Sequence, residues 1–523
     1  MRLHRYLSWI QRLCWPSTSA KNDSEEAEEV REHETKLAKH SYSNIDAIKR
    51  ISLQETAERI ASEFEFSDKD VRRAVEGFVR QMNEGLKSPG CAIEQLPSFI
   101  TEVPTGREEG TYLAVDLGGT NVRICSVTLN GDGTYALLQD KMPIPVALMT
   151  SATSNALFLW VATMVREFLR KHYPGSLKSD TTASIFDLGF TFSHAVDQIN
   201  INSGTLIRWS KGFDIDGVVG QDICALLQNV FVELDVPVRV TALINDTVGT
   251  LMARAYASPQ SAKTILGAVF GTGTNGAYVE QASRITKLDG VGTGAKGSIM
   301  IVNSEWGNFD QKLQYLPTTS FDRAIDAGSV NPGFEMFEKR ISGMYLGEIL
   351  RLAILSLTTD PKVRLFAGTL ISTTSKLYAQ WGLDSSFMSH LESDATVHLS
   401  VTRTQIEEYL DISIVSYEEL EAIRIISHAI GRRSARLSAV ALGAVILQTD
   451  CLRTADKGRI DVGVDGSLIA LYPGFLAEMR TALKAVEEIG AEGEGKIDIL
   501  LARDGSGVGA ALAAHIAGKV VDS

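Results

Sequence analysis

Apolar residues along the chain follow two periods, one typical of amphipathic helices and one typical of buried strands. Residues 45–84 place apolar side chains three or four positions apart, which predicts two helices that break near Ser67, a residue suited to cap the second. Similar spacing predicts helices over residues 157–172, 218–234, 248–257, 334–357, 363–383, 404–410, 417–447 and 508–516. Apolar runs predict strands over residues 182–193, 238–244, 300–309, 459–464 and 496–501, and residues 201–215 are predicted to form a loop. Mixed elements of this kind predict an α/β protein.

The most distinctive stretch is residues 112–129 (YLAVDLGGTNVRICSVTL), which predicts a strand, a tight glycine turn and a returning strand. Paired glycines let backbone N–H groups approach a bulky anion, because no Cβ stands in the way. Thr120 adds a hydroxyl donor and Arg123 a cation, while Asp116 is placed to hold Mg2+ or its water shell. This first glycine turn (residues 117–121) fits a phosphate site, and it equally fits an ordinary hairpin.

Residues 264–281 (TILGAVFGTGTNGAYVEQ) repeat the same pattern further along the chain. An apolar strand again meets a glycine-rich segment, which we name the second glycine turn (residues 271–274), and a strand returns. Two such units suggest a duplicated architecture, in which two facing lobes each contribute a phosphate-binding turn. This remains a hypothesis at the level of sequence, because the spacing alone does not establish a duplication.

Polar residues follow several predicted strands at the point where the strand ends: Ser193, Asn245 and Asp246, Asn275, and Glu305. Open α/β sheets bind ligands at the carboxyl ends of their strands. A polyhydroxylated substrate needs several converging hydrogen-bond acceptors, because each hydroxyl must replace its bonds to water. A carboxylate there can also remove a hydroxyl proton, and Lys211 is placed to hold sugar oxygens or to offset phosphoryl charge. Any one of these acids taken alone fits a helix cap or a surface charge equally well.

Composition limits the class of protein. The chain has 523 residues, a net charge of −13, 44% apolar and 22% charged residues, which is typical of a soluble protein with more than one lobe and argues against nucleic-acid binding. Its five cysteines are scattered, which favours a reducing compartment, and we expect a cytoplasmic protein. No apolar run reaches the ~18 residues that a bilayer span needs.

The N-terminus differs from the rest of the chain. Residues 1–20 contain no acid and place Arg2, Arg5 and Arg12 among apolar residues that share one helical face. Such a basic amphipathic segment predicts contact with an anionic membrane surface or organelle targeting, with a disordered tail as the alternative. Residues 23–34 (DSEEAEEVREHE) then form an acidic linker or exposed helix.

Taken together, these motifs resemble the hexokinase family over residues 41–516. The segments that carry the resemblance are LAVDLGGTNVR, LGFTFS, RWSKGFDI, LINDTVGT, FGTGTNGAY, SEWGNFD, PGFEMFEKRISGMYLGE, GVDGSL and DGSGVGAAL. The resemblance implies an actin-like ATPase (ribonuclease H-like) fold, with two lobes around a central cleft. It also implies an N-terminal segment and linker over residues 1–40, a small domain over 41–246 and a large domain over 247–523.

The implied reaction is phosphorylation of a hexose (glucose, or fructose or mannose) at its 6-hydroxyl by ATP with Mg2+, the first step of glycolysis. Asp246 matches the catalytic base, and Lys211 a second catalytic position. The positions that match sugar contacts are Ser193, Ser210, Lys211, Asn245, Asp246, Asn275, Glu305 and Glu338. Those that match nucleotide or phosphate contacts are Asp116, Leu117, Gly118, Gly119, Thr120, Asn121, Arg123, Gly271, Thr272, Gly273, Thr274, Gly343 and Ser467, with Lys141 as a further contact. No direct metal ligand is implied other than Asp116 for the Mg2+ of ATP.

The chain departs from the family pattern at three places, of which Ser210, where many members have threonine, is a mild change that keeps the hydroxyl. His194 and Ala195 stand where an aromatic residue and proline are usual, which predicts a looser loop around Ser193. Phe334 and Glu335 stand where a glutamine pair is common, and phenylalanine cannot reproduce hydrogen bonds to the sugar. These departures raise an alternative, a sugar-responsive regulator with weak catalysis. The expected partners are hexose and ATP, together with the mitochondrial outer surface or a protein bound through residues 1–20.

Overall fold

The computed structural model describes residues 52–153, 155–177, 185–209, 212–259, 261–288, 299–413, 415–454 and 458–521. Leu53–Ser523 forms one compact unit. The predictions for residues 1–20 and for the acidic linker lie outside the described residues, as do those for Ser210 and Lys211. The predicted domain boundary after residue 246 stays a prediction.

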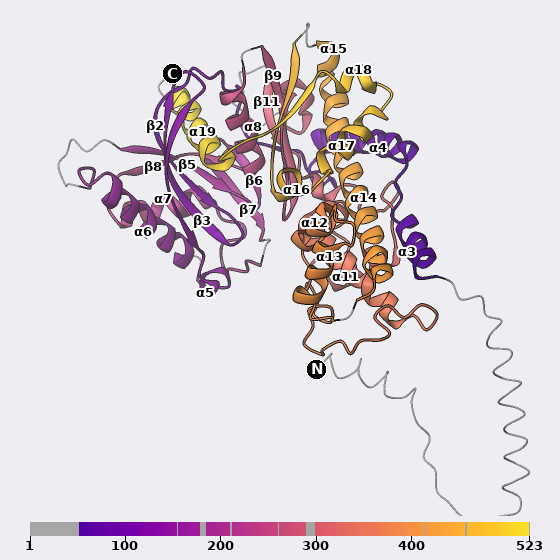
Figure 1. Cartoon of the computed structure of the whole chain (residues 1–523). Coiled ribbons are helices and arrows are strands. Elements are labelled where there is room, and N and C mark those ends of the chain that lie inside the picture. Colours follow the sequence, from indigo (N-terminus) through magenta and orange to yellow (C-terminus); the bar gives the residue numbers. More distant parts are fainter. Residues whose placement is uncertain are drawn as a thin grey trace, which may run out of the picture. The chain divides into compact units, whose positions relative to one another are not determined.

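A five-stranded sheet occupies the earlier part of the chain (Figure 1). Its order is β4-β3-β2-β5-β8, with antiparallel pairing from β4 to β2 and parallel pairing from β2 to β8. The strands are β2 (Glu109–Leu117), β3 (Asn121–Asn130), β4 (Tyr135–Pro143), β5 (Phe186–Phe192) and β8 (Val238–Ile244). Sequence reasoning missed β4 because this edge strand buries none of its side chains fully and therefore carries little apolar signal.

A six-stranded sheet occupies the later part, with the order β1-β11-β10-β9-β12-β13. The strands are β1 (Leu96–Pro97), β9 (Ala262–Phe270), β10 (Thr274–Gln281), β11 (Ile299–Asn303), β12 (Arg459–Asp465) and β13 (Ile497–Leu501). From β11 to β13 the pairing is antiparallel, antiparallel, parallel and parallel, as in the first sheet from β4 to β8. The duplicated strand pattern suspected from the two glycine turns is therefore confirmed.

Helices cover both faces of the five-stranded sheet. On one face α6 (Asn155–His172) and α7 (Ile223–Glu233) share a core with inward residues of β2 and β3, such as Val115 and Ile124. On the other face lies α19 (Gly505–Val521), and α8 (Asp246–Ala257) packs between α19 and strands β9, β10 and β12. In Figure 1 the yellow α19 accordingly crosses the violet sheet. The last helix of the chain thus completes the first sheet.

The two central helices cross at glycines. A Cβ atom added to Gly509 of α19 would lie 2.2 Å from the Cα of Gly249 in α8. A Cβ on Gly189 of β5 would lie 2.0 Å from the carbonyl oxygen of Ala510. Such distances are far below van der Waals contact, so only glycine fits at these positions. The close crossing brings the first residues of α8 and α19 to the same end of the molecule.

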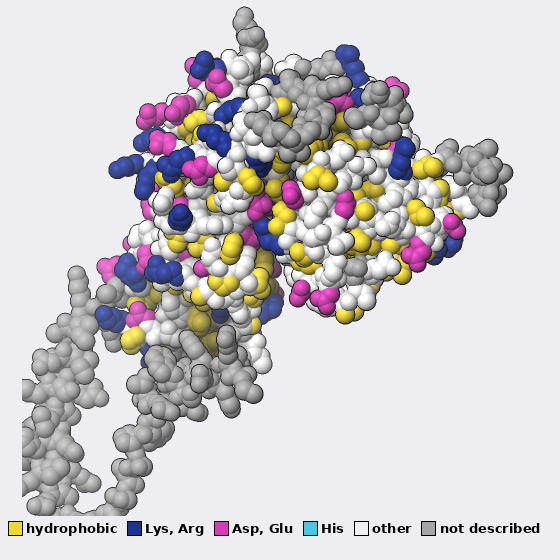
Figure 2. Space-filling model, turned by 180° about the vertical axis from the view of Figure 1, so that it is seen from behind, with side chains coloured by type: hydrophobic (Ala, Val, Ile, Leu, Met, Phe, Trp, Pro, Cys, Tyr) yellow, Lys and Arg dark blue, Asp and Glu magenta, His cyan; other side chains and the backbone are white. Residues whose placement is uncertain are grey.

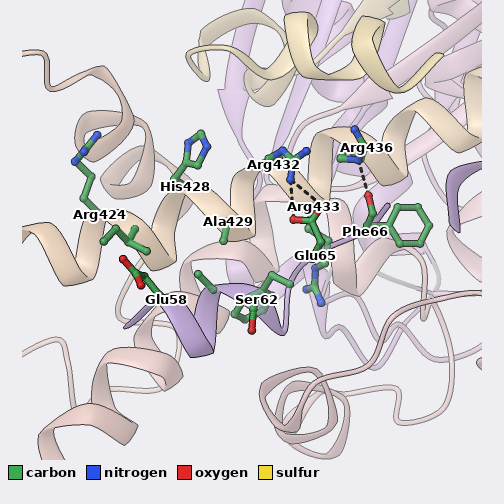
Figure 3. Close-up of a pocket in the computed structure, with 13 residues that line it drawn as sticks. Glu58, Ser62, Glu65, Phe66, Arg424, His428, Ala429, Arg432, Arg433 and Arg436 are labelled. Carbon is green, nitrogen blue, oxygen red and sulfur yellow. Dashed lines mark hydrogen bonds and ion pairs between the residues drawn. The ribbon is translucent and has the colours of Figure 1, made fainter. Parts of the chain in front are cut away.

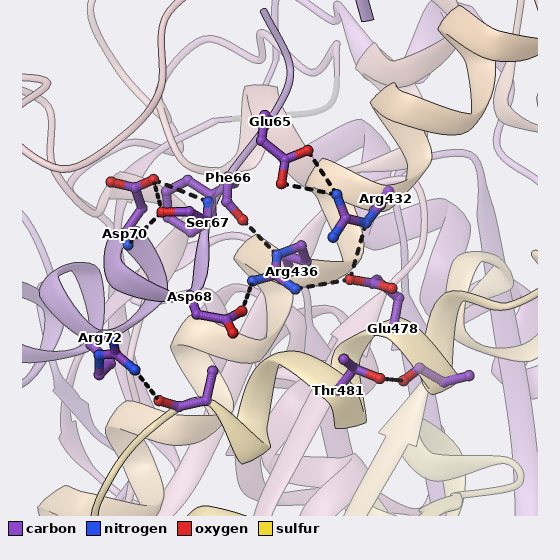
Figure 4. A network of polar contacts seen from close by, with 12 residues as sticks. Glu65, Phe66, Ser67, Asp68, Asp70, Arg72, Arg432, Arg436, Glu478 and Thr481 are labelled. Atoms are coloured by element: carbon purple, nitrogen blue, oxygen red, sulfur yellow. Dashed lines mark hydrogen bonds and ion pairs between the residues drawn. The ribbon is translucent and has the colours of Figure 1, made fainter. Parts of the chain in front are cut away.

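The six-stranded sheet packs against a helical layer built on α14 (Tyr417–Thr449), a helix with buried residues along its whole length. Against it pack α3 (Leu53–Ser62), α4 (Asp68–Lys87) and α17 (Phe475–Lys484), and the predicted cap Ser67 begins α4 with a capping box. Figure 4 shows how ion pairs from two arginines of α14 connect these helices: Arg436 contacts Asp68 and Glu478, and Arg432 contacts Glu65 and Glu478. The remaining helices are α5 (Val146–Met149), α9 (Ser320–Gly328), α10 (Glu338–Ile341), α11 (Gly343–Thr359), α12 (Ser385–Ser393), α13 (Ser400–Thr404), α15 (Cys451–Thr454), α16 (Ser467–Leu471) and α18 (Gly490–Glu494).

Several local predictions were wrong. The helix predicted over residues 334–357 is divided into α10 and α11 at Ser342, and the strand predicted over 300–309 ends at Asn303. Residues 363–383 form a chain of turns instead of a helix: Arg364 and Phe366 have left-handed backbones, and the hydroxyl of Ser375 donates to the carbonyl oxygen of Leu410. Serine and threonine side chains that bond to backbone groups compete with helix formation. The predicted loop over residues 201–215 contains the second strand of a hairpin, β6 (Ala195–Asn200) with β7 (Ser203–Arg208).

The surface carries mixed charge. Basic and acidic side chains are interspersed over the face in Figure 2, and apolar side chains lie between them. No helix among the described residues combines the length and the apolar character that a membrane crossing requires.

Candidate functional site

The polar residues predicted at strand ends converge between the two sheets. Asp116 lies near the end of β2 and pairs in register with Thr191 of β5, two residues before Ser193. Asn245 and Asp246 follow β8 directly, and Asn275 lies near the start of β10. Because β2, β5 and β8 are parallel neighbours, Asp116, Ser193 and Asp246 lie at the same edge of the five-stranded sheet. Asn275 Nδ2 lies 3.5 Å from Asn245 Oδ1, which places the start of β10 beside the end of β8.

Asp246 is the first residue of α8, and its neighbour Asn245 is the cap. The side-chain oxygen of Asn245 accepts hydrogen bonds from the Thr247 backbone N–H at 2.9 Å and from the Thr247 hydroxyl at 2.7 Å. Because Asn245 caps the helix, the Asp246 carboxylate is not needed as a cap. No donor among the described residues bonds to that carboxylate, which is half-buried. The alternative that Asp246 serves as a helix cap is therefore wrong.

Three side chains form an amide–carboxylate cluster beside Asp246. Asn275 Nδ2 donates to Asn303 Oδ1 at 2.9 Å and to Glu305 Oε1 at 3.2 Å, and Asn303 Nδ2 donates to the same Glu305 oxygen at 2.8 Å. Glu305 follows β11 and has a left-handed backbone with φ of 54°. This uncommon conformation costs free energy and is held here by the surrounding contacts. The cluster offers fixed acceptors and donors to a polyhydroxylated ligand.

The charge state of Glu305 depends on its neighbours. Burial raises its pKa to about 7, the Asn303 amide and Arg208 lower it, and the Glu94 and Asp246 carboxylates raise it further. A carboxylate that titrates near neutral pH is sensitive to any change in these neighbours. Glu305 is therefore the most adjustable acceptor of the cluster.

Asp116 is almost fully buried and forms part of a three-residue network. Arg123, on the returning strand β3, donates from Nε to Asp116 Oδ2 at 2.9 Å, and the Ser506 hydroxyl donates to the same oxygen at 2.7 Å. Burial raises the pKa of the Asp116 carboxyl above its ordinary value, while Arg123 and Ser506 lower it. Ser506 also accepts from Arg123 Nη2 at 3.0 Å, so α19 is tied into the first glycine turn.

The donor set fits a metal ion only as a companion of the nucleotide. One oxygen of Asp116 is already bonded to Arg123 and Ser506, and no group of three or more candidate ligands occurs among the described residues. Mg2+ typically takes one or two carboxylates, with substrate phosphates and water completing its shell. Asp116 is suited to supply the one protein oxygen or to orient a water of that shell.

Each glycine turn leaves two successive backbone N–H groups without an acceptor among the described residues. In the first turn these are Gly119 and Thr120, while Gly118 N–H bonds to the Asn121 carbonyl at 3.0 Å. In the second turn they are Thr272 and Gly273. Adjacent free N–H groups at a glycine turn form an anion-binding concavity. The geometry favours phosphate binding over the ordinary hairpin for both turns.

The second glycine turn is held by three neighbouring segments. Glu338 Oε2 accepts from Thr274 N–H at 2.8 Å, and Gly343 N–H donates to the Gly271 carbonyl at 2.8 Å. A Cβ on Gly271 would lie 3.2 Å from Gly466, the residue before Ser467. Glu338, Gly343 and Ser467, predicted from distant motifs, therefore surround this turn. Lys141 is exposed on β4, in register with Arg123.

The loop that presents Ser193 is packed. The His194 ring is buried and lies 4.8 Å from the ring of Phe192, 5.0 Å from Trp209 and 5.1 Å from Phe213, measured between centroids. The imidazole occupies the place that we expected the missing aromatic ring to leave open. Phe334, at another departure from the family pattern, is exposed.

Four residues of the site were not predicted: Glu94, Arg208, Asp465 and Ser506. Asp465 is the last residue of β12. Burial and the Asp246 and Asp504 carboxylates raise its pKa, so Asp465 lies close enough to Asp246 to belong to the site. The strand-end rule would have found Asp465. Ser506 starts the last helix, and Arg208 bonds to Glu94 across the fold, so no local pattern marks these three.

A separate cavity of about 560 Å3 lies between α3 and α14, and its lining contains none of the predicted site residues (Figure 3). Its exposed cations Arg424, His428 and Arg432 each pair with a glutamate, at 2.9, 2.8 and 2.7 Å. Their partners are Glu421 of α14, Glu392 of α12 and Glu65 between α3 and α4, so the charges are already compensated, and this cavity is a gap between helices rather than a substrate site.

Comparisons with known proteins identify the family of the chain. Two family profiles, both described as hexokinase, match residues 56–256 and 265–516. The chain is 47% identical over 486 residues to a glucokinase of Aspergillus niger, covering 90% of this chain and 98% of that protein. It is 39% identical over 488 residues to glucokinase-1 of Saccharomyces cerevisiae, covering 88% and 97% of the two chains.

Among solved structures, a hexokinase from Schistosoma mansoni complexed with glucose matches with a TM-score of 0.77 and 32% identity over 89% of this chain and 99% of that one. A second hexokinase structure matches with a TM-score of 0.73 and 30% identity, with the same coverage. The fold is thus the actin-like ATPase fold expected from the sequence. On its matching profiles, its relatives and its structural neighbours, this chain belongs to the hexokinase family.

Proposed function

We propose that this chain transfers the terminal phosphoryl group of ATP to the 6-hydroxyl of glucose, with other hexoses as further substrates. The observation that carries the proposal is the placement of Asp246. Its carboxylate is relieved of capping by Asn245, and its charge acts on Glu305 of the amide cluster and on Asp116 of the first glycine turn. A carboxylate between the amide–carboxylate cluster and the two glycine turns is suited to catalyse transfer of a phosphoryl group from a nucleotide to a sugar.

In this proposal Asp246 accepts the proton of the attacking hydroxyl as that oxygen approaches phosphorus. Asn275, Glu305 and Ser193 hold the other hydroxyls and orient the sugar, because a polar site replaces each bond that the sugar makes to water. The Gly119, Thr120, Thr272 and Gly273 N–H groups bind the phosphates. Positioning and electrostatics then lower the barrier.

When bound with ATP, Mg2+ would supply charge neutralisation between the phosphates, and Asp116 is the residue suited to hold it or its water. Arg123 keeps the Asp116 oxygen oriented from the adjacent strand at 2.9 Å. Ser210 and Lys211, which match sugar-contacting and catalytic positions, remain part of the proposal from the sequence.

The test is a coupled assay with purified protein, glucose and Mg-ATP, in which a working enzyme turns over at about 1 per second or faster. Asp246→Asn should lower kcat by about 10²-fold or more while glucose still quenches or enhances tryptophan fluorescence. Asp498→Asn is the matched control, since Asp498 pairs with Arg459 at the start of two strands, away from the site. Absence of turnover in the unmodified protein, or full turnover in Asp246→Asn, would contradict the proposal.

The regulatory alternative gains no specific support, because His194 packs the loop whose loosening had suggested weak catalysis. We further propose a cytoplasmic enzyme that residues 1–20 attach to the mitochondrial outer surface, based on the basic amphipathic pattern of that segment. A fluorescent reporter fused to residues 1–20 should collect on mitochondria. A uniform cytosolic signal would exclude this attachment.

A further inference from the structure

An ion pair connects the β6–β7 hairpin with the edge of the six-stranded sheet. Arg208 is the last residue of β7, and Nη1 of its guanidinium donates to Glu94 Oε1 at 3.0 Å. In the hairpin, Arg208 is paired with Ala195, which follows Ser193 by two residues. Arg208 therefore holds the loop that presents Ser193 from one side.

Glu94 is fixed on the opposite side by its backbone. Lys287 Nζ donates to the carbonyl oxygens of Glu94 and Gln95, both at 2.7 Å. Gln95 N–H donates to the Ser304 carbonyl at 3.1 Å, one residue before Glu305. One hydrogen bond thus ties the Glu94 segment to the end of β11 and two tie it to Lys287, so Arg208 meets a partner whose backbone is fixed.

Both members of this ion pair act electrostatically on Glu305 of the amide–carboxylate cluster. Glu305 is acted on by the carboxylates of Glu94 and Asp246 and by the guanidinium of Arg208. Arg208 is acted on in turn by Glu94, Glu305 and Glu335. Among the described residues, the groups that face Glu305 are Glu94 before β1, Asn275 in β10, Asn303 in β11, Arg208 in β7 and Asp246 in α8. Arg208 is the one cation in this described set.

We propose that Arg208 is a positioning residue for hexose binding, which holds the Ser193 loop against the Glu305 cluster through its ion pair with Glu94. The inference rests on the proposed function and names a residue that acts through others, without contact to the reacting atoms. It also predicts that Glu94 and Arg208 affect Glu305 in opposite directions, because one is a like charge and the other a compensating charge.

An ordinary surface ion pair is the competing explanation. The Arg208 side chain is 43% exposed, and exposed pairs contribute only about 0 to 1 kcal/mol to stability. Such a pair would have the same small effect as Arg239 with Asp187, which meet at 2.8 Å between the starts of β8 and β5. Arg239→Gln is for this reason the matched control, an arginine of similar exposure whose partner lies away from the site.

The experiment measures glucose binding by tryptophan fluorescence without ATP, and steady-state kinetics from pH 5 to 9. Arg208→Gln should raise both the glucose Kd and KM about tenfold, with kcat changed less than about threefold, and move the acidic limb of kcat/KM to higher pH. Glu94→Gln should move that limb to lower pH. The double variant should bind glucose better than Arg208→Gln alone, since the unpaired carboxylate beside Glu305 is gone.

Three results would overturn the inference: wild-type affinity in Arg208→Gln, equal behaviour of Arg208→Gln and the Arg239→Gln control, or limbs that move in the same direction in both single variants. If Arg208→Gln does not fold, the direction of the limb in Glu94→Gln decides alone. Failure of the proposed function is distinguishable, because it would abolish turnover in the unmodified protein. The pH dependence of glucose binding would then still test Arg208.

Discussion

The two glycine turns share a sequence pattern and an equivalent place in their sheets, but they differ in what holds them. In the first turn, Gly118 N–H bonds to the Asn121 carbonyl, and the Thr120 carbonyl accepts from Ile144 N–H at 2.9 Å. Ser506 of α19 adds a hydrogen bond to Asp116. Its charged groups, Asp116 and Arg123, belong to its own strands. Residues 271–274 of the second turn contain no charged side chain, and the carboxylate beside this turn is that of Glu338 in α10, which accepts from Thr274 N–H.

The same strand–glycine–strand pattern therefore serves two different tasks in the two sheets. The first turn carries the electrostatics, because Asp116 and Arg123 set the charge beside its free N–H groups. The second turn carries the positioning, because Gly343 and Glu338 fix its backbone from two separate elements. Substitutions should therefore separate charge effects at the first turn from geometric effects at the second.

The largest effect is expected from the charge of the first turn. Asp116→Asn removes the carboxylate that Arg123 and Ser506 both contact, and kcat should fall about 10²-fold or more, as for other lost electrostatic groups. Glu338→Gln at the second turn should lower kcat less and raise the glucose KM. Steady-state kinetics of these two variants tests whether charge effects belong to the first turn and geometric effects to the second. Unchanged kcat in Asp116→Asn would refute it.

Alanine substitution in the glycines comes next. A Cβ on Gly273 would lie 2.9 Å from Glu338 Oε2, so Gly273→Ala must displace the carboxylate that bonds to Thr274. We expect roughly tenfold weaker binding of both glucose and ATP, about 1.4 kcal/mol each. On Gly118 the nearest atom to an added Cβ is 3.4 Å away, an ordinary contact, so Gly118→Ala should fold normally and raise only the KM for ATP. A raised glucose KM in Gly118→Ala would show that the turns are not separable.

The pH dependence sharpens the role of the cluster beside the second turn. The pKa of Glu305 is about 7 in the folded chain, above its ordinary value of 4.5, so the folded chain holds a proton there that the unfolded chain has lost. The stability contribution of this group therefore falls as pH rises from 4.5 through about 7. Glucose needs the ionised acceptor, so its affinity should rise about fivefold to tenfold from pH 6 to 8. Titration with glucose checks this, and Glu305→Gln should remove the dependence.

The smallest effect on activity is expected from a single hydrogen bond behind the second turn. Trp306 Nε1 donates to Thr274 Oγ1 at 3.0 Å in a buried place. Thr274→Val would leave this N–H unpaired and cost about 1 to 3 kcal/mol of stability. The KM for ATP should rise less than in Gly273→Ala, because the backbone N–H that bonds to Glu338 is retained. Thr111→Val on the first hairpin is the control, since Thr111 pairs with Thr128 at an exposed position. Thermal unfolding measures both; equal melting temperatures would contradict the prediction.

Sequence patterns predicted the parts of the fold that have a strong period. Strand 238–244 and the strand at 459–464 were found almost to the residue, because their buried faces are continuous. The edge strand β4 and the turns over residues 363–383 were missed or wrong, because the first is polar and the second depends on side-chain bonds to the backbone. The periodicity of apolar residues does not show which side chains bond to distant backbone groups.

The site divides in the same way. Asp116, Asp246 and Glu305 were predicted from their positions at strand ends, and the structure brings them together. Arg208 and Glu94 were not predicted, because the role of each depends on a partner that is distant in the sequence. That Asn245 and not Asp246 caps α8 also required the structure, since both residue types are good caps.

The hydrogen bond from Ser506 to Asp116 joins residues 390 positions apart. A ribosome adds roughly 5 to 20 residues per second, so the nascent chain carries its first glycine turn for about 20 to 80 seconds before Ser506 is synthesised. During that interval the five-stranded sheet lacks α19, and one of its faces is uncovered. Newly made protein can therefore acquire its complete phosphate network only after α19 has been synthesised, and products truncated before α19 should be substrates for chaperones and proteases instead of partial enzymes.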